Sequence, residues 1–554
     1  MRLVNIRPGE LGTQACPIDS RSPARAARAS LHTWARQRPQ HHWRIAHWGE
    51  AWRSRAPLRD AATGLAHALL VHGVIYRAFS FGVVTALAGL LAVCCSSPID
   101  TGSDARSSQP PNWDAQLRLP EAVDVNPAPH VFETTLTSKI VNLEVVPGRL
   151  TPVWTYNGLL PGPLIRVARG DRLIVHLVNE LPDPTTIHWH GIRLPNAMDG
   201  VPGTTQREVE PGSSFDYDFV VPDSGTFWYH PHVDSAAQVG FGLYGPLIVT
   251  DPDEAPGLGD ELVLLLSDMM VSEDGTQADP TAGGELATLF GREGDTLLVN
   301  GKVNPVLHAV AARRQRWRLI NAAKSRYFQL MLDGQQFTRI GGDQGLIESP
   351  QSSDRILLTP AQRADVVLDL AVPSATTRAV RWVPYDRGFG STEFRSEETL
   401  FTVQTSADPG QPNPALPPLH REILPINLSN PTMQYLDLTA SAKGEPFSLG
   451  INGVPAERAA PLTATLGEIQ MWSVHNSVAF AHPFHLHGFF FQVIDVDGIA
   501  PAVGEWHDTV NVPIDATVRL AVSFDERPGL WMFHCHILDH ADAGMMGMVA
   551  LRER

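Results

Sequence analysis

Four short motifs in the sequence each place two histidines on either side of a single residue. They are His188-Trp189-His190, His230-Pro231-His232, His485-Leu486-His487 and His534-Cys535-His536. Because successive side chains of a strand alternate between its two faces, both imidazoles of such a motif point the same way. A lone motif of this kind is usually a structural pair. Four motifs that face one another would offer eight imidazoles to a cluster of metal ions.

Cys535 lies between two of these histidines, so its thiol must point away from them. The other three cysteines lie within the first 95 residues, which leaves Cys535 without a disulfide partner in the rest of the chain. His540 follows five residues later, Met545 five residues after that, and His482 precedes His485 by three. Two histidines, a thiolate and a weak thioether are the ligand set of a blue-copper electron-transfer site. The sequence thus predicts a second metal site at His482, Cys535, His540 and Met545, with core packing as the alternative role for Met545.

An internal repeat indicates which elements carry these residues. Asn-Gly pairs begin at Asn157, Asn300 and Asn452, and 21 to 24 residues beyond each pair an alternating, strand-like stretch ends in Asn179, Asn321 or Asn476. Nine and eleven residues beyond this closing Asn, the first and third copies carry histidines, whereas the second carries Leu330 and Leu332. Three copies of one β-domain are the simplest account. We therefore predict an all-β fold with domains at residues 125–253, 254–410 and 411–554, of which the middle one holds no copper.

The composition supports this fold class and excludes one kind of partner. The chain has 43% hydrophobic and 18% charged residues with 45 Gly and 45 Pro, which favours a globular, turn-rich β-protein. Beyond residue 95 it carries 31 basic and 55 acidic side chains. We therefore expect no nucleic-acid partner.

The amino-terminal region differs from the rest. Residues 1–73 are predicted to be a poorly ordered leader, residues 74–95 a signal- or lipoprotein-like segment, and residues 96–124 a linker. Phe79 to Val93 forms an apolar run of about 15 residues, which is typical of a signal peptide and short for a membrane span. The following Cys94 completes a stretch that resembles a bacterial lipobox, although Val93 is bulkier than the usual small residue. We expect export to the periplasm or cell envelope with a possible lipid anchor at Cys94; cleavage by ordinary signal peptidase and a membrane-tethered precursor are the alternatives.

Taken together, the four histidine motifs, Cys535, His540 and Met545 resemble the signatures of three-domain multicopper oxidases of the laccase-like group. The resemblance covers roughly residues 125–554 and implies cupredoxin-like Greek-key β-barrel domains. It implies four copper ions. The type 1 ligands would be His482, Cys535, His540 and Met545. The type 2 ligands would be His188 and His485. The type 3 pair would be held by His190, His230, His232, His487, His534 and His536.

The reaction implied by the resemblance couples four one-electron oxidations of a phenolic or other aromatic donor to reduction of dioxygen to water. Asp199, nine residues after His190, matches a family position credited with proton supply; the alternative is a turn residue. Many bacterial relatives carry Glu directly after the ligand equivalent to His540. This chain has Ala541 there, which leaves Asp542 as the substitute.

Other functions and residues stay as alternatives. A cuprous oxidase in copper tolerance is the closest rival, disfavoured because the 11 Met form no rich cluster. A copper-free structural relative and a two-domain nitrite reductase are less favoured. Asp508, in Trp506-His507-Asp508-Thr509-Val510, is predicted to be structural rather than catalytic. The expected partners are dioxygen and a small-molecule reductant, which is a phenol or Cu(I). The enzyme itself is expected to be a monomer.

Overall fold

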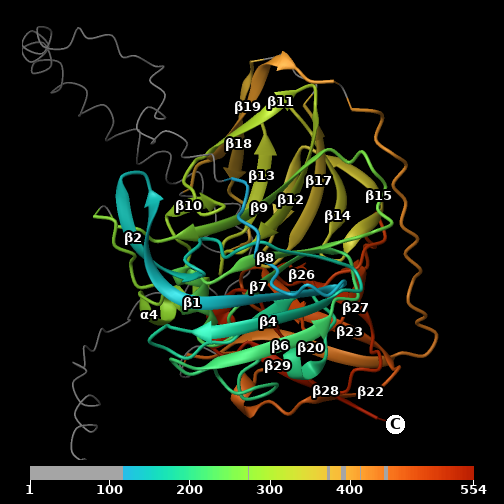
Figure 1. The fold of residues 1–554 in the computed structure, drawn as a ribbon. Helices are drawn as coiled ribbons and strands as arrows, with labels where there is room; N and C mark the ends of the chain where they lie inside the picture. The colour runs from blue at the N-terminus through green and yellow to red at the C-terminus, as the bar shows by residue number, and fades with distance from the viewer. Residues whose placement is uncertain are drawn as a thin grey trace, which may run out of the picture. The chain divides into compact units, whose positions relative to one another are not determined.

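The computed structural model describes residues 117–553, apart from residues 273, 371–374, 389–394, 412 and 442–446. The predicted leader, the signal-like segment and most of the 96–124 linker lie outside the described residues. Strands dominate the described part, and its helices are short (Figure 1). Within that part of the chain, no helix combines the length and apolar character needed to cross a membrane.

Six sheets form three pairs, one pair in each domain. Domain 1 contains the sheets β2-β1-β4-β6 and β3-β8-β7-β5. Its strands are β1 (Val131–Val146), β2 (Arg149–Tyr156), β3 (Ile165–Ala168), β4 (Arg172–Asn179), β5 (His188–His190), β6 (Ser214–Val220), β7 (Gly225–His230) and β8 (Gly245–Thr250).

Domain 2 contains the sheets β10-β9-β12-β17-β14-β15 and β11-β19-β18-β13-β16. Its strands are β9 (Asp260–Met269), β10 (Thr296–Val299), β11 (Val306–Ala311), β12 (Arg314–Asn321), β13 (Phe328–Leu332), β14 (Phe337–Gly342), β15 (Gly345–Ser353), β16 (Arg355–Leu358), β17 (Arg363–Asp369), β18 (Thr377–Val383) and β19 (Glu398–Pro409).

Domain 3 contains the sheets β21-β20-β23-β27-β25 and β22-β29-β28-β24-β26. Its strands are β20 (Thr432–Ala440), β21 (Leu449–Ile451), β22 (Leu462–Thr465), β23 (Ile469–Asn476), β24 (His482–Leu486), β25 (Phe491–Val496), β26 (Thr509–Val512), β27 (Thr517–Ser523), β28 (Gly529–Cys535) and β29 (Met546–Arg552).

The three domains share part of their strand order, although their sheets differ in the number of strands. In the first sheet of each, the opening strand pairs in parallel with the strand that ends in the closing Asn: β1 with β4, β9 with β12, and β20 with β23. In the second sheet, a short edge strand pairs in parallel with the last strand of the domain: β3 with β8, β11 with β19, and β22 with β29. The predicted all-β fold of three related domains is confirmed.

The repeated Asn residues make the same local structure each time. Both residues of each Asn-Gly pair have positive φ, with 55° and 75° at Asn157-Gly158, 49° and 73° at Asn300-Gly301, and 56° and 73° at Asn452-Gly453. These values define a type I′ turn, which Asn and Gly tolerate best. The turn reverses the chain within two residues, and a single bridge closes it each time, Tyr156 to Leu159, Val299 to Lys302 and Ile451 to Val454.

Short helices connect some of the strands. They are α3 (Ser235–Phe241), α4 (Gly284–Phe290) and α5 (Leu538–Asp542), with single 3₁₀ turns η2 (Asn196–Met198) and η3 (Ala456–Arg458). Of these, α3 and α5 each follow a histidine motif. Both α3 and α4 contact α5. The helix α5, which carries His540, therefore contacts a helix of domain 1 and a helix of domain 2.

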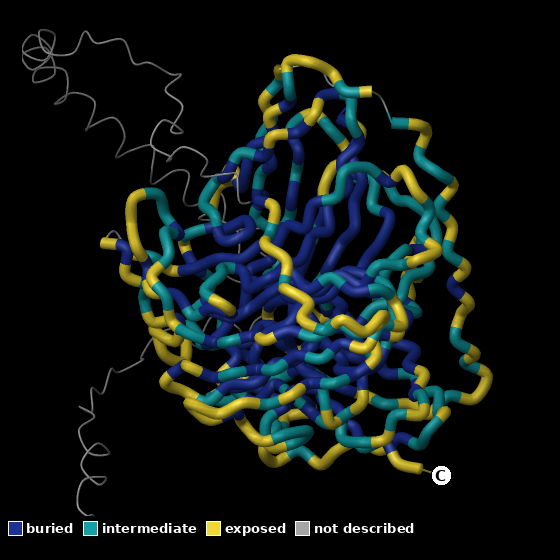
Figure 2. Tube along the Cα trace, viewed as in Figure 1, coloured by how far each residue is buried: buried dark blue, intermediate teal, exposed yellow. Residues whose placement is uncertain are grey.

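Domains 1 and 3 share one large apolar core, to which domain 2 adds Tyr327. One cluster of buried side chains includes Trp189 and Phe227 of domain 1 together with Trp472 and Phe533 of domain 3. The core of domain 2, built around Trp317, forms a separate cluster. Figure 2 shows the buried strands inside and the exposed loops outside. Apolar burial therefore holds the histidine-bearing domains against each other.

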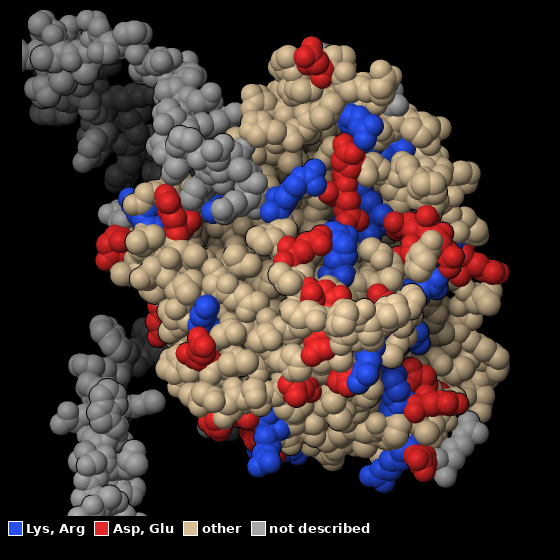
Figure 3. Space-filling model, in the orientation of Figure 1, with Lys and Arg blue, Asp and Glu red and all other residues tan. Residues whose placement is uncertain are grey.

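Charged side chains of both signs are interspersed on the face that Figure 3 shows. Several of them pair between domains. Arg166 of domain 1 donates to Glu261 of domain 2 at 2.8 Å, and Arg339 of domain 2 donates to Glu505 of domain 3 at 2.8 Å. Ion pairs thus join domain 2 to its neighbours, in addition to a small apolar cluster that includes Trp228, Ile320 and Leu538.

Candidate metal centre

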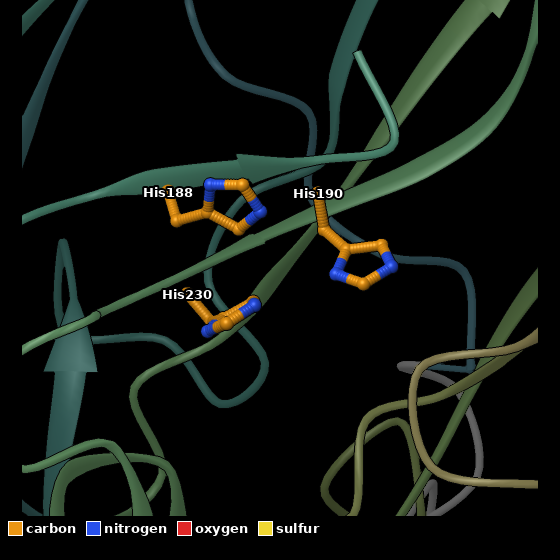
Figure 4. A group of neighbouring side chains, drawn as sticks. All are labelled: His188, His190 and His230. Atoms are coloured by element: carbon orange, nitrogen blue, oxygen red, sulfur yellow. The ribbon is translucent and has the colours of Figure 1, made fainter. Parts of the chain in front are cut away.

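The first two histidine motifs lie side by side in domain 1. Strand β5 pairs antiparallel with β7, with His188 opposite His230. Figure 4 shows the imidazoles of His188, His190 and His230 close together. Trp189 between the two histidines of β5 belongs to the apolar core instead. The alternation of a strand thus separates the polar and apolar side chains of this motif.

The other two motifs pair in the same way in domain 3. Strand β24 pairs antiparallel with β28, with His485 opposite His534 and Phe484 opposite Cys535. His487 continues directly beyond β24, and its N–H donates to the carbonyl of Met532 at 2.9 Å. Domain 3 therefore presents a second pair of histidine motifs.

The two pairs of motifs face each other across the domain boundary. The ring centroids of His188 and His487 are 3.9 Å apart, as are those of His190 and His485, and both pairs stack. All eight imidazoles are buried, His232 being the most exposed at 8%. The eight residues that the structure brings together are His188, His190, His230, His232, His485, His487, His534 and His536.

Hydrogen bonds fix the tautomer of several of these rings. Nδ1 of His534 lies 2.9 Å from the carbonyl oxygen of Cys535 and must carry the proton, because a carbonyl only accepts. Nδ1 of His487 likewise lies 2.9 Å from Oδ2 of Asp199. The two Nε2 atoms of these histidines face each other at 3.1 Å. Two lone pairs at this distance repel unless a cation lies beside them, so this arrangement fits a metal ion.

Other ring nitrogens in the cluster have no hydrogen-bond partner although they are buried. They are Nε2 of His188, His230, His232 and His485, Nδ1 of His190, and both ring nitrogens of His536. Buried polar atoms are normally paired, so a group of unpaired ones needs an explanation. Metal ligation supplies it, because a neutral imidazole binds through such a lone pair.

Burial also keeps the rings neutral. Desolvation, and next the neighbouring histidines, hold the pKa of His230, His487 and His534 well below the usual value. The pKa of His190 is lowered in the same way, chiefly by desolvation. Neutral imidazoles need not lose a proton before a metal binds.

A second donor group lies on the other face of β28. Nδ1 of His482 is 3.3 Å from Sγ of Cys535, Sγ is 3.5 Å from Nδ1 of His540, and the two nitrogens are 3.1 Å apart. Nε2 of His540 donates to the carbonyl of Leu289 at 3.0 Å, which leaves its Nδ1 as the free donor atom. The three donors thus surround one point, as a trigonal metal site requires.

Two further features complete this second group. Met545 is fully buried, and its carbonyl accepts the backbone N–H of Cys535 at 3.1 Å. Burial raises the pKa of the Cys535 thiol to about 12. A bound cation would reverse this preference, since a coordinating thiol is deprotonated.

The structure separates the two predicted acidic residues. Asp199 is 1% exposed, and its carboxylate contacts Nδ1 of His487 at 2.9 Å and Nδ1 of His188 at 3.3 Å. Asp542 is exposed, and its Oδ2 accepts the N–H of Ala236 at 2.8 Å. Asp199 therefore lies at the histidine cluster, whereas Asp542 lies at the start of α3.

Two residues of domain 2 that sequence reasoning missed also reach this region. Arg363 and Gln344 both donate to the carboxylate of Asp508, at 2.6 to 2.8 Å and at 2.6 Å. Asp508 in turn contacts Nε2 of His190 at 3.1 Å. Neither residue belongs to a recognisable motif, and only the fold brings them to Asp508.

Known proteins share these features. Family models described as multicopper oxidase match residues 139–254, 260–377 and 425–554. The chain is 32% identical to the multicopper oxidase MmcO of Mycobacterium tuberculosis over 82% of this chain and 92% of that protein. It is 27% identical to a laccase of Bacillus subtilis, over 78% and 98%. A multicopper oxidase from Campylobacter jejuni, described as a metallo-oxidase, has a similar structure, with a TM-score of 0.71 and 29% identity over 79% and 94%.

Three cupredoxin-like domains with buried histidine and cysteine donors define a copper-dependent oxidoreductase. The chain belongs to the multicopper oxidase family. Its cofactors are four copper ions, one of type 1, one of type 2 and a type 3 pair.

Proposed function

We propose that the enzyme is laccase-like and oxidises phenolic or other aromatic donors at a type 1 copper, with dioxygen reduced to water at the other three. The type 1 copper is held by His482, Cys535, His540 and Met545. The type 2 copper is held by His188 and His485. The type 3 pair is held by His190, His230, His232, His487, His534 and His536. The proposal depends above all on one observation: in each group the potential ligand atoms lie within 4.8 Å of one another, and the histidine cluster contains buried ring nitrogens without a hydrogen-bond partner.

Bound copper would supply one-electron acceptors and the place where dioxygen is reduced. The chain itself provides the path between the two groups. Cys535 is bonded through the backbone to His534 and His536, so the thiolate ligand of one site adjoins ligands of the other. Cys535 would thus give electrons accepted one at a time at the first site a covalent route to the second.

Asp199 is the proposed proton donor at the cluster. Its Oδ2 accepts a hydrogen bond from Nδ1 of His487, while its Oδ1 is buried and has no hydrogen-bond partner. A free carboxylate oxygen beside the ligands can hold a proton until the reaction needs it. Asp542, exposed and bonded to the start of α3, is proposed only as a point of proton exchange with solvent.

Steady-state rates on fully metallated enzyme test the donor. We expect a phenol to be oxidised faster than Cu(I) under matched conditions. Negligible phenol oxidation together with fast Cu(I) oxidation would favour the cuprous oxidase instead.

We also propose that the three domains span residues 125–253, 254–410 and 411–554 and that the enzyme is a monomer. We further propose that it is exported to the periplasm or cell envelope. Lipid attachment at Cys94 would anchor it. Mass spectrometry of the mature amino terminus tests this. A diacylglyceryl-modified Cys94 supports the anchor, an unmodified terminus further along supports a soluble exported enzyme, and an unprocessed Met1 in the cytoplasm contradicts export.

A further inference from the structure

Two aspartates contact the histidine cluster in matching ways. The backbone carbonyl of Asp199 accepts from Nδ1 of His188, in its own domain, at 2.8 Å. Its carboxylate accepts from Nδ1 of His487, in the opposite domain, at 2.9 Å. Asp199 thereby orients one histidine of domain 1 and one of domain 3.

Asp508 repeats this pattern from domain 3. Its backbone carbonyl accepts from Nδ1 of His485, in its own domain, at 2.8 Å. Its Oδ1 lies 3.1 Å from Nε2 of His190, in domain 1. The Oγ1 of Thr509 adds contacts to the same two rings, at 3.1 and 3.3 Å. Each aspartate therefore holds one proposed type 2 ligand through its backbone and one proposed type 3 ligand through its carboxylate.

The two carboxylates differ in what else they contact. Oδ1 of Asp199 has no hydrogen-bond partner. In Asp508, both oxygens accept from the guanidinium of Arg363, at 2.8 and 2.6 Å, and Oδ2 also accepts from Gln344 at 2.6 Å. Asp508 is thus fixed in place by the middle domain, whereas Asp199 keeps one oxygen free.

Arg363 is itself held from three sides. Its side chain is fully buried, and its Nε donates to the carbonyl of Thr226 in domain 1 at 2.9 Å. It donates to the carbonyl of Asp343 in domain 2 at 2.7 Å and to Asp508 in domain 3. A bidentate pair of this geometry resists rotation of the carboxylate more than a single hydrogen bond does.

From these contacts we infer that Asp508 is a positioning residue of the trinuclear copper cluster, and that Arg363 and Gln344 of the copper-free middle domain hold it in place. The carboxylate accepts from Nε2 of His190, so that the Nδ1 of this ring, which has no partner, faces the cluster. The partner of a ligand's outer nitrogen sets both its tautomer and its rotation. Domain 2 therefore contributes to copper binding without providing a ligand.

This inference rests on the proposed ligand roles of His190 and His485. Its test must therefore measure cluster copper separately from the type 1 copper. Titration with a chelator gives the concentration that removes half of the cluster copper. Elemental analysis, visible absorption and electron paramagnetic resonance then separate the type 1 copper from the cluster. The two variants that remove the contact are Arg363→Gln and Asp508→Asn.

We expect both variants to keep the type 1 copper and its visible absorption. Loss of an outer partner of a ligand typically costs about 10–100-fold in metal affinity. Half of the cluster copper should therefore leave at a chelator concentration about 10–100-fold lower than in the parent. Arg363→Lys keeps the charge but cannot make the bidentate pair with the carboxylate, so compared with Arg363→Gln it should recover part of this loss.

Arg316→Gln is the matched control. Arg316 lies in the same domain, is buried, and pairs with Glu254 and Asp365. No hydrogen bond among the described residues joins it to Asp508 or to a cluster histidine. This variant should lose stability and keep the parent's copper retention.

Two results would overturn the inference. One is a parent-like chelator midpoint and resonance spectrum in Arg363→Gln. The other is equal copper loss in Arg316→Gln, which would indicate general damage to domain 2. If Arg363→Gln does not fold, Gln344→Leu, which removes one donor from Asp508, must lower the midpoint, and an unchanged midpoint there counts against the inference. His485→Ala in parallel tests the proposed function alone, because it must remove cluster copper whatever Asp508 does.

Discussion

Domain 2 and its neighbours share a structural frame and differ at two positions on it. The closing Asn makes similar contacts in each domain: its amide donates to at least two carbonyls and its Oδ1 accepts the N–H two residues on, at Asn179, Asn321 and Asn476. Beyond it, domains 1 and 3 have histidines, whereas Leu330 and Leu332 are buried in the core of domain 2. The shared contacts belong to the common fold, and at these two positions domain 2 buries leucines in its core where its neighbours have histidines.

Domains 1 and 3 differ from each other at the second metal site. A short helix follows the histidine motif in both, α3 after His232 and α5 after His536. At the spacing that gives Cys535, His540 and Met545 in domain 3, domain 1 has Pro231, Ala236 and Phe241. The same backbone therefore carries the proposed blue-copper ligands in one copy and apolar residues in the other.

The largest effect is expected from replacing Cys535, whose position in domain 1 is occupied by Pro231. Cys535→Ser removes the thiolate that the type 1 copper needs, so we expect complete loss of the visible thiolate-to-copper absorption and of donor oxidation. Absorption spectra and oxygen uptake measure both, and circular dichroism checks that the fold survives. Retained blue colour would mean that Cys535 is an inert buried thiol.

Leu330→His tests whether the frame of domain 2 can bind metal once a histidine is restored. The side chain would enter an apolar core beside Trp317 and Phe401, without a partner for its nitrogens. We expect a loss of about 2–5 kcal/mol in the free energy of unfolding, measured with denaturant. Copper should remain at four ions per chain, as in the parent.

Met331→His is the control for this variant, because Met331 lies on the opposite, half-buried face of β13. Its effect should stay within about 0.5 kcal/mol, as for most surface substitutions. A fifth bound copper in Leu330→His would show that the facing of β13 is not what excludes metal.

The sequence predicted those features that depend on local spacing. The period of two residues in a strand determines that His534 and His536 share a face and that Cys535 takes the other. The Asn-Gly turns and the closing Asn could be recognised because they recur at domain length. Fold class and the facing of the side chains within each motif therefore followed from spacing along the chain, whereas the division of the eight cluster histidines into type 2 and type 3 ligands came from the family resemblance.

The supporting contacts could not be predicted in this way. Asp508 lies 318 residues from His190, 145 from Arg363 and 164 from Gln344. No periodicity relates such positions. The motif around Asp508 could therefore predict a structural role but not the residues that it contacts. Asp542 was chosen by its distance along the chain from His540, but the direction of α5 turns it towards α3 instead of the cluster histidines.

Asp199→Asn sharpens the comparison between the two aspartates that contact the cluster. The amide keeps nearly the same shape but cannot carry a proton, so we expect reoxidation of the reduced enzyme by dioxygen to slow by about 100-fold. Reduction of the type 1 copper by donor should stay unchanged, which stopped-flow absorption measures in the same sample. Reoxidation at the parent's rate would leave Asp199 as a residue that only orients His188 and His487.

Met545→Leu is expected to have the smallest effect. It tests whether the weak thioether of domain 3 influences the reduction potential of the type 1 copper. An axial thioether donates electron density to the oxidised copper, so replacing it with an apolar side chain should raise the reduction potential. For one electron, a rise of about 60 mV would make reduction of the type 1 copper tenfold more favourable. Redox titration followed at the visible band measures the change.

The control for this variant is Met548→Leu, on β29 and half-buried, which makes the same change three residues away. Copper content should match the parent in both variants, because His482, Cys535 and His540 still surround the metal position. If Met545→Leu leaves the potential as it is in Met548→Leu, Met545 serves only to fill the core. A raised potential in Met545→Leu alone identifies the thioether as a ligand, since both variants lose a sulfur atom but only one loses it beside Cys535.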